Sequence, residues 1–187
     1  MFDWLFGKKA PTGPVVRDRV WVDLDARDRA VVRAAREGTG VVVTCFEETR
    51  ERLRTRLAEA GVEGVKVVLA DGPLPSDGEL LVAERHPDPG ADRALWERLL
   101  QERPGLVPVA FCALDDPLMK RFGGDRTAVL MRQLGMEPDE PVEHAMVSQA
   151  LAKAREKVGA RVGAVGAVAR TRSMEEWFRL YLPGNLA

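Results

Sequence analysis

Four short apolar runs, rich in β-branched residues, constrain the fold more than any other feature of this sequence. They are residues 41–45 (VVVTC), 65–69 (VKVVL), 80–83 (LLVA) and 107–112 (VPVAFC). Nearly continuous apolar runs of this length are typical of strands buried on both faces of a sheet. Helical patterns separate most of them, which predicts a right-handed, mainly parallel sheet covered by helices. A weaker run at residues 20–22 is expected at one edge of that sheet.

Two helices are expected between these strands. Residues 47–60 form a helical pattern that Gly61 ends, with acidic residues ahead of basic ones as the helix dipole favours. Asp92 is expected to cap a second helix, which carries Leu95 and Leu99 on its apolar face and ends before the strand at residues 107–112.

From Asp115 onward the pattern is helical. Asp115 and Pro117 are expected to open a short helix, Asp125 a second one, and Pro141 a longer third one. The third helix has a core-facing stripe made of Val147, Ala150, Leu151, Ala154 and Val158.

The last part of the chain is less uniform. Residues 159–169 are almost all Gly, Ala and Val, and this composition is compatible with a thin helix, a strand or a linker. Ser173 with Glu176 then forms a capping box for a final helix.

Composition narrows the range of functions. The net charge is −1, so no global attraction toward nucleic acid is expected, and any charged partner must meet a local patch. No apolar run reaches the roughly 18 residues of a membrane span, and the N-terminus has neither a basic leader nor a small-residue cleavage site. Cys45 and Cys112 lie in apolar runs without a CxxC pair. We therefore expect a cytoplasmic protein with no metal site, no cofactor and no small-molecule substrate.

A long and specific pattern follows the last strand. It consists of residues 113–126 (ALDDPLMKRFGGDR), 134–136 (LGM), 140–144 (EPVEH) and Val147. The pattern resembles the SecA preprotein-translocase ATPase family, where the second nucleotide-binding domain leads into the helical scaffold. Upstream, residues 84–86 (ERH) resemble the family just before its arginine-finger segment, and residues 41–61 resemble the opening of the same domain.

This resemblance covers about residues 20–158 and implies a RecA-like, three-layer α/β domain followed by a C-terminal helical extension. We expect an N-terminal amphipathic segment and linker at residues 1–16, a degenerate RecA-like domain at residues 17–114 and the helical extension at residues 115–187.

The residues that bind phosphate in a RecA-type ATPase are missing. Such a site needs a GxxxxGK[ST] loop, whose amides and lysine surround the phosphates, and the sequence contains none. The resemblance places that loop in a first nucleotide-binding domain, which has no counterpart here. It also places Arg98 on the first of two finger arginines, while Gln101 replaces the second. Because Glu97 and Leu100 replace glycines of the finger loop, the segment is also typical of an amphipathic helix with Arg98 at its surface.

We therefore expect a non-catalytic, SecA-like protein-interaction module with an eroded nucleotide site, linked to protein translocation and binding another protein such as a translocase component. An alternative is that Arg98 completes the ATPase site of another protein in trans. A further alternative is a haloacid-dehalogenase-like phosphatase, because Asp23 and Asp25 form a DxD motif after a strand. Thr44 and the pair Asp115-Asp116 would complete such a site with magnesium.

The N-terminal residues are candidates for partner binding. Phe2, Trp4, Leu5 and Phe6 form an apolar cluster followed by Lys8 and Lys9, and Pro11, Gly13 and Pro14 make the next stretch a linker. Such a segment can rest weakly on an anionic membrane surface, but it is too short to anchor alone. Docking on a protein surface, either its own or that of a partner, is the favoured interpretation.

Overall fold

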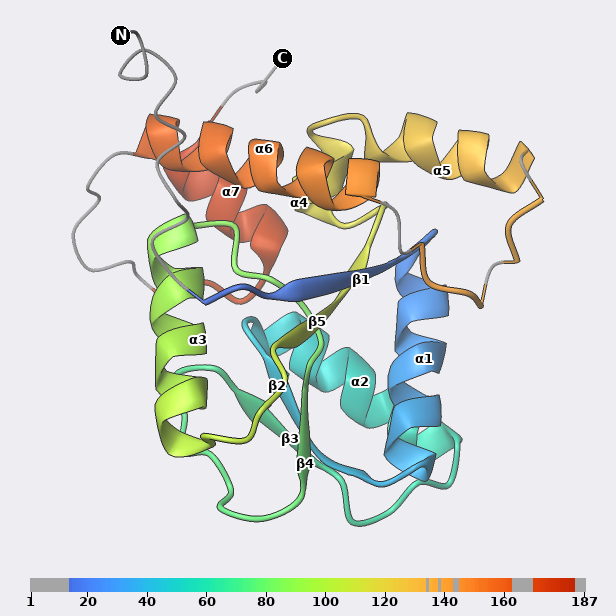
Figure 1. Ribbon diagram of the computed structural model, residues 1–187, viewed down its shortest axis with the longest axis vertical. Helices are drawn as coiled ribbons and strands as arrows, with labels where there is room; N and C mark the ends of the chain where they lie inside the picture. Colours follow the sequence, from blue (N-terminus) through green and yellow to red (C-terminus); the bar gives the residue numbers. More distant parts are fainter. Residues whose placement is uncertain (1–13, 134, 138, 143–144, 163–169, 184–187) are drawn as a thin grey trace, which may run out of the picture.

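The computed structural model describes residues 14–133, 135–137, 139–142, 145–162 and 170–183. Within these residues, one five-stranded parallel sheet lies at the centre of the molecule, in the order β1-β5-β4-β2-β3 (Figure 1). The strands are β1 (Arg17–Trp21), β2 (Thr39–Thr44), β3 (Lys66–Leu69), β4 (Glu79–Val82) and β5 (Val109–Ala113). The expected parallel α/β sheet is confirmed, with the weak first strand at an edge.

The helices of the described residues are α1 (Leu24–Arg36), α2 (Glu47–Glu59), α3 (Pro89–Glu102), α4 (Pro117–Lys120), α5 (Gly124–Gln133), α6 (Ala145–Val162) and α7 (Met174–Tyr181). None of them is long and apolar enough to cross a membrane. The sequence patterns did not single out α1, which begins inside the DxD motif, with Asp23 as its cap and Asp25 in its first turn.

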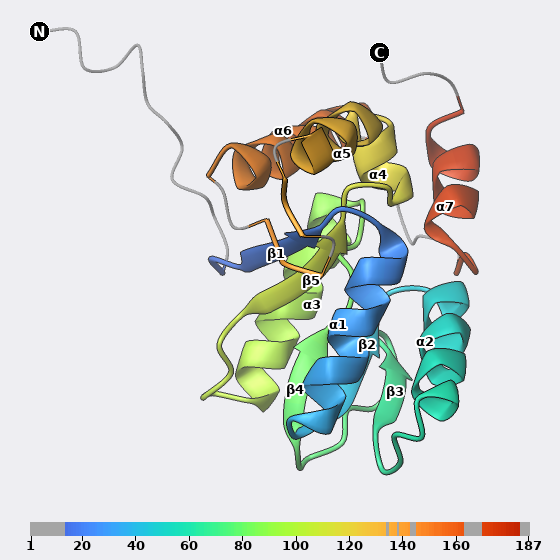
Figure 2. The same ribbon diagram turned by 90° about the vertical axis from the view of Figure 1, so that its right-hand side faces the viewer.

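Alternation along β2 explains how the sheet is covered on both faces. Val42 packs in a core cluster with residues of α1 and α2, such as Val31 and Leu53. Val41 and Val43 point to the opposite face and pack in a second cluster with α3. Figure 2 shows α1 and α2 on one side of the sheet and α3 on the other. These are the three layers of the fold.

The C-terminal helices share the second core cluster with the sheet. Figure 1 shows α4, α5, α6 and α7 gathered at one end of the molecule. Leu151 and Val158 of α6 and the fully buried Trp177 and Phe178 of α7 pack in the same cluster as Val82 of β4. The predicted apolar stripe of α6 therefore faces the α/β core, except that Ala150 is exposed.

Several helix starts differ from the prediction, most clearly those of α3 and α6. The cap of α3 is Asp88, which accepts hydrogen bonds from the amides of Gly90 (3.0 Å) and Ala91 (3.4 Å), while Pro89 takes the first helical position. The prediction that Asp92 caps this helix was wrong, because the Asp-Pro pair four residues earlier supplies both the cap and a pre-formed first turn.

The helix expected to start at Pro141 begins at Ala145 instead. The amide of Val142 donates to the carbonyl of Val20 at 2.6 Å and forms an isolated antiparallel bridge with β1. This bond keeps the backbone extended beside the edge strand, so the helix starts later.

Candidate functional site

The connections of the sheet diverge between two neighbouring strands. After β2 the chain enters α2 on one face, and after β4 it enters α3 on the opposite face. Because β2 and β4 lie side by side, their carboxyl ends form a topological switch point. Ligands of open α/β sheets bind in the crevice outside the strands at such a point.

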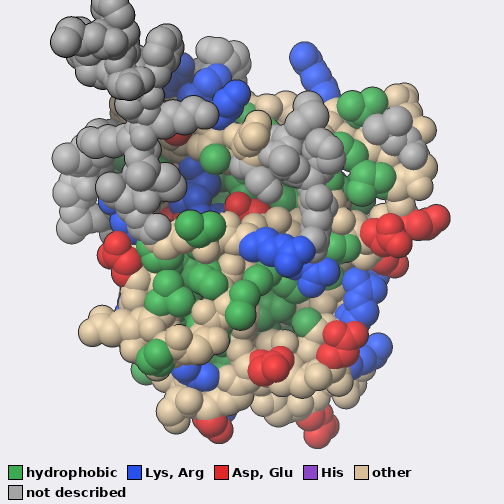
Figure 3. All heavy atoms as spheres, viewed as in Figure 1, with side chains coloured by type: hydrophobic (Ala, Val, Ile, Leu, Met, Phe, Trp, Pro, Cys, Tyr) green, Lys and Arg blue, Asp and Glu red, His purple; other side chains and the backbone are tan. Residues whose placement is uncertain are grey.

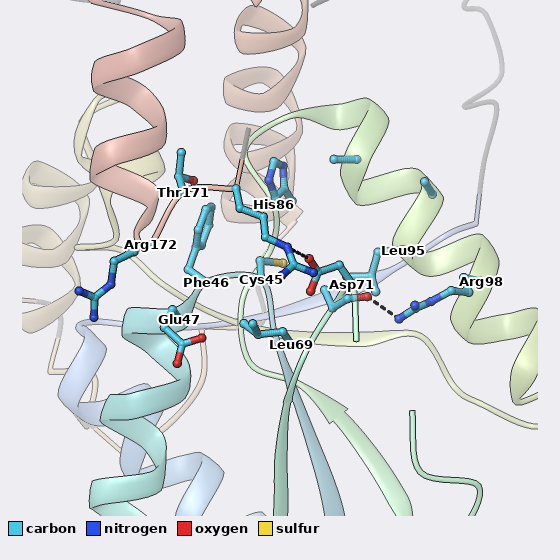
Figure 4. Close-up of a pocket in the computed structure, with 14 residues that line it drawn as sticks. Cys45, Phe46, Glu47, Leu69, Asp71, His86, Leu95, Arg98, Thr171 and Arg172 are labelled. Atoms are coloured by element: carbon cyan, nitrogen blue, oxygen red, sulfur yellow. Dashed lines mark hydrogen bonds and ion pairs between the residues drawn. The ribbon is translucent and has the colours of Figure 1, made fainter. Parts of the chain in front are cut away.

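A groove of about 670 Å³ opens at this switch point, and we call it the carboxyl-edge groove. Its floor consists of Cys45 and Phe46, which follow β2, and residues 69–71 at the end of β3. One wall is a single face of α3 that presents Ala91, Ala94, Leu95 and Arg98 at helical spacing. The volume lies within the range of about 300–1,000 Å³ typical of ligand pockets. Figure 4 shows these side chains around the hollow.

The opposite wall is residues 170–172, which we call the strap because three contacts hold it across the groove. Arg170 forms an ion pair with Asp71 at 2.6 Å, beyond the end of β3. The carbonyl of Arg172 accepts from the amide of Glu48 at 2.9 Å, and its guanidinium approaches Glu51 at 3.4 Å. The strap leads directly into α7, which Ser173 caps as predicted by accepting from the amide of Glu176.

Glu84 occupies the N-terminus of α2. One carboxylate oxygen accepts from the amides of Cys45 (2.8 Å) and Phe46 (3.0 Å), and the other accepts from the hydroxyl of Thr49 (2.8 Å). The residue at the cap position, Phe46, supplies no side-chain cap of its own. Burial raises the pKa of Glu84, while Arg27 and these hydrogen bonds act in the opposite direction. The protein's own carboxylate therefore lies beside the N-terminus of α2, the kind of position that otherwise attracts an anion.

Arg85 is the centre of a buried ionic network. It pairs with Asp92 of α3 at 2.8 Å and with Asp18 of β1 at 2.7 Å, and Asp92 also pairs with Arg155 of α6. Burial acts to lower the pKa of Arg85, but Asp92 and then Asp18 raise it overall. Burial, and then repulsion from Arg85, lower the pKa of Arg155, while Asp92 and Asp18 act in the opposite direction. The network ties the edge strand, α3 and α6 together.

His86 completes the ERH motif and lines the carboxyl-edge groove. Its ring stacks on Phe46 at 5.4 Å and meets the edge of Trp177 at 5.8 Å, while Nδ1 accepts from the amide of Asp88. Burial lowers the pKa of His86 and so favours the neutral ring. Burial also raises the pKa of the Cys45 thiol well above its usual value, which disfavours a thiolate nucleophile beside this histidine.

Arg98, the predicted phosphate-binding candidate, lies on the α3 wall of the groove. Its guanidinium donates to the backbone carbonyls of Ala70 and Gly72, and its Nε lies 3.8 Å from Glu102. The dashed line from Arg98 in Figure 4 marks the bond to Ala70. The side chain is 33% exposed, so it reaches the groove while holding the β3–β4 loop.

The DxD residues have contacts of their own. Asp23 caps α1 by accepting from the amide of Ala26 at 2.8 Å and pairs with Arg132 at 3.0 Å. Asp25 forms an ion pair with Arg56 of α2. The structure therefore gives each of these carboxylates a helix-stabilising contact. No cluster of metal-binding side chains is found among the described residues.

Asp116 is buried at the cap of α4, where it accepts from the amide of Met119 at 2.8 Å. Burial raises its pKa to about 7, even though this amide and Arg27 favour the charged form. Its neighbour Asp115, one of the residues proposed to complete a phosphatase site, has a pKa raised by burial as well. The sequence pattern predicted that Asp115 and Pro117 open this helix, but the structure places the cap at Asp116 instead.

The remaining candidates, Phe2, Trp4, Leu5 and Phe6, lie outside the described residues, as do residues 163–169 of the Gly/Ala/Val segment. Sequence reasoning missed the roles of Asp92 and Arg155 in the ionic network. A usable signal existed, because Asp92 lies three residues before Leu95, and Arg155 four residues after Leu151, on apolar helix faces. A charged residue on such a face indicates a buried ion pair.

Comparison with known proteins supports a relationship over part of the chain. No family model matches it. It is 33% identical over 119 residues to the protein translocase subunit SecA of Nitratidesulfovibrio vulgaris, which covers 63% of this chain and 14% of that protein. The corresponding protein of Maridesulfovibrio salexigens is 39% identical over 97 residues, covering 51% and 12%. That of Acinetobacter baumannii is 37% identical over 82 residues, covering 44% and 9%. The chain thus spans a small fraction of these relatives, and part of it is related to SecA.

Proposed function

We propose that this chain is a non-catalytic protein-interaction module that works with the protein-translocation machinery and uses the carboxyl-edge groove to bind a partner protein. The similarity to translocase subunits over 119 residues supports the connection with translocation. The proposal depends mainly on one observation, the position of Glu84.

A nucleotide phosphate at the N-terminal end of α2 would compete with the Glu84 carboxylate for backbone amides. The amides of Cys45 and Phe46 lie directly before α2, between β2 and the helix, and the Glu84 carboxylate already accepts from both. A phosphate bound there would meet a like charge or would have to displace a buried side chain. The sequence contains no P-loop that could bind the phosphates elsewhere. The contacts of Glu84 therefore support an eroded nucleotide site.

The distribution of charged and apolar side chains on the surface also supports a protein partner. On the face shown in Figure 3, Lys and Arg side chains are interspersed with Asp and Glu rather than gathered in one basic field. The groove itself combines apolar side chains such as Phe46, Leu69 and Leu95 with arginines at its rim. An apolar centre with a polar rim is typical of protein interfaces.

Two measurements test the proposal. Isothermal calorimetry with Mg·ATP should give no binding, and micromolar affinity would contradict the eroded site. Vesicles reconstituted with the translocase of the organism that encodes the chain should retain the purified protein in a flotation assay. Ala94→Arg, inside the groove, should reduce this retention, whereas Ala58→Arg, at an exposed position of α2 outside the groove, should not. Equal retention of both variants, or none of the wild type, would exclude this use of the groove.

The alternative in which Arg98 acts in trans makes a different prediction. To reach another protein's nucleotide, Arg98 would have to release the carbonyls of Ala70 and Gly72. In the vesicle assay we expect ATP turnover by the translocase to be the same with wild-type chain and with Arg98→Ala. A loss of stimulation confined to Arg98→Ala would favour the half-site function instead.

The phosphatase alternative is addressed by magnesium-dependent cleavage of a phosphate ester. Because Asp23 is engaged as a helix cap and Asp25 in an ion pair, we expect no cleavage above the level of Asp23→Asn. Cleavage that Asp23→Asn abolishes would restore the phosphatase hypothesis.

A further inference from the structure

Backbone groups on the floor of the carboxyl-edge groove already have hydrogen-bond partners. The carbonyls of Ala70 and Gly72 accept from Arg98, and the amide of Ala70 donates to the carbonyl of Thr44 at 2.7 Å. The two amides directly before α2 donate to Glu84. A partner that adds a β-strand depends on main-chain donors and acceptors that are open. These contacts therefore favour a partner that is recognised by side chains.

The centre of the groove offers apolar surface. Ala94 is exposed on the α3 wall, and Ala91 and Leu69 are half-buried, while Phe46 and Leu95 lie deeper. Figure 4 shows Phe46, Leu69 and Leu95 around the hollow. The small side chains of Ala91 and Ala94 allow a partner to approach α3 closely. Because removing apolar surface from water is the main source of binding free energy, a partner should bring a large apolar side chain to this centre.

The rim of the groove carries an excess of positive charge. Three arginines and two acidic residues line it, namely Arg98, Arg170, Arg172, Glu47 and Asp71. Glu47 forms an ion pair with Arg50 of its own helix. The side chains of Arg170 and Arg172 are 81% and 76% exposed, so the carboxylate of a partner can reach their N–H donors. The rim is therefore complementary to an acidic segment.

Asp71 shows how a carboxylate is held at this rim. Its Oδ2 lies 2.6 Å from Nε of Arg170, and in the view of Figure 4 Asp71 lies between Arg172 and Arg98. The Asp71 side chain is 49% exposed. An exposed ion pair of this kind contributes little free energy, so exchanging Asp71 for the carboxylate of a partner costs little.

We propose that the carboxyl-edge groove binds an acidic and apolar segment of its partner protein. An Asp or Glu side chain of that segment takes the place of Asp71 on Arg170, and a large apolar side chain beside it packs over Leu69 and Ala94. The inference rests on the proposed function, in which the groove binds a protein, and it names the chemical class of the bound segment.

A random peptide library displayed on phage tests the inference before any partner is known. The purified 187-residue chain is the bait, and Ala94→Arg, which fills the groove, is the counter-selection. Peptides enriched on the wild type and not on Ala94→Arg should combine Asp or Glu with Leu, Phe or Trp. Enrichment of basic or uncharged peptides would overturn the inference, as would equal enrichment on both baits or no enrichment at all.

Fluorescence anisotropy with the most enriched peptide then tests the charge contacts. Arg170→Asp should weaken binding about tenfold, because an attractive contact becomes a repulsive one. Arg126→Asp makes the same reversal at an exposed position of α5 outside the groove and should leave the affinity unchanged. Circular dichroism should show that both variants are folded. Equal affinities of the two variants would contradict the role given to Arg170.

Removing the competing carboxylate should have the opposite effect. Asp71→Asn should tighten binding of the same peptide about twofold to fivefold, the range that an exposed ion pair provides. Asp77→Asn, an exposed carboxylate of the β3–β4 loop that does not line the groove, should change nothing. Weaker or unchanged binding in Asp71→Asn would show that the peptide does not replace Asp71 on Arg170.

The inference and the proposed function fail separately. Acidic, apolar peptides from the selection, without retention of the chain on translocase vesicles, would support the chemistry of the groove and contradict the link to translocation. Retention that depends on the groove, together with peptides of another chemistry, would support the proposed function and overturn this inference.

Discussion

The guanidinium of Arg85 and the carboxylate of Asp92 face each other in the interior, with Nη2–Oδ2 at 2.8 Å and Nε–Oδ1 at 3.0 Å. Only 7% of the Arg85 side chain and 2% of that of Asp92 is exposed. Removing either partner alone is strongly destabilising, because the remaining partner is then a buried and unpaired charge.

Asp92→Ala should therefore lower the free energy of unfolding by about 3–5 kcal/mol, the range for breaking a buried ion pair. Both Arg85 and Arg155 lose a partner in this variant. Asp139→Ala is the matched control, because it breaks an exposed pair with Arg29 and should cost less than about 1 kcal/mol. Urea denaturation measures both. Similar values for the two variants would contradict the role given to the network.

Glu84→Gln should destabilise the protein by about 1–3 kcal/mol, the cost of leaving a buried polar group unpaired. The amide group of Gln has one acceptor oxygen, so its NH₂ would face one of the donors that Glu84 now satisfies at Cys45, Phe46 and Thr49. Hydrogen exchange should speed up at the amides of Cys45 and Phe46, which directly precede α2. Glu48→Gln, at an exposed position of the same turn, serves as the control and should change neither quantity.

Stability should fall as pH rises from about 4 to 7 through the titration of Asp116. Its pKa is about 7 in the folded protein and 3.8 ordinarily, so in this interval the folded state holds a proton that the unfolded state has lost. One such group contributes a slope of up to about 1.4 kcal/mol per pH unit. Asp116→Asn keeps the cap acceptor and removes the titration.

Urea denaturation at several pH values should therefore show a shallower decline for Asp116→Asn than for the wild type. Asp77→Asn changes an exposed carboxylate and should leave the decline unaltered. An equally steep decline in Asp116→Asn would mean that other groups control the pH dependence.

Gly124→Ala should be among the most destabilising single-methyl changes in this protein. A Cβ at this position would lie 2.0 Å from the carbonyl oxygen of Leu114 and 2.9 Å from the backbone of Met119. Because backbone atoms on both sides must move, we expect a loss of about 3 kcal/mol or more. Gly105→Ala places the same methyl in open space and should stay within about 0.5 kcal/mol of the wild type. Thermal unfolding of the two variants checks the difference.

Local patterns in the sequence were sufficient for much of the secondary structure. The apolar runs determined the strands, because a strand buried on both faces must be apolar throughout, as in β2. The pair Ser173 and Glu176 determined the start of α7, because the Ser173 hydroxyl caps the amide of Glu176 only three residues away. The absence of a P-loop is likewise a property of the sequence alone.

The tertiary structure decided which residues those patterns bring together. Glu84 and Cys45 are 39 positions apart, and their bond exists because β2 and β4 are neighbours in the sheet. The contact of Asp92 with Arg155 likewise depends on α6 packing against α3. The groove between α3 and the strap has the same origin, since no local rule specifies which distant segments share an edge. Hydrophobic periodicity is encoded within a few residues, whereas the pairing of charged groups depends on the order of the strands, which the sequence pattern left open.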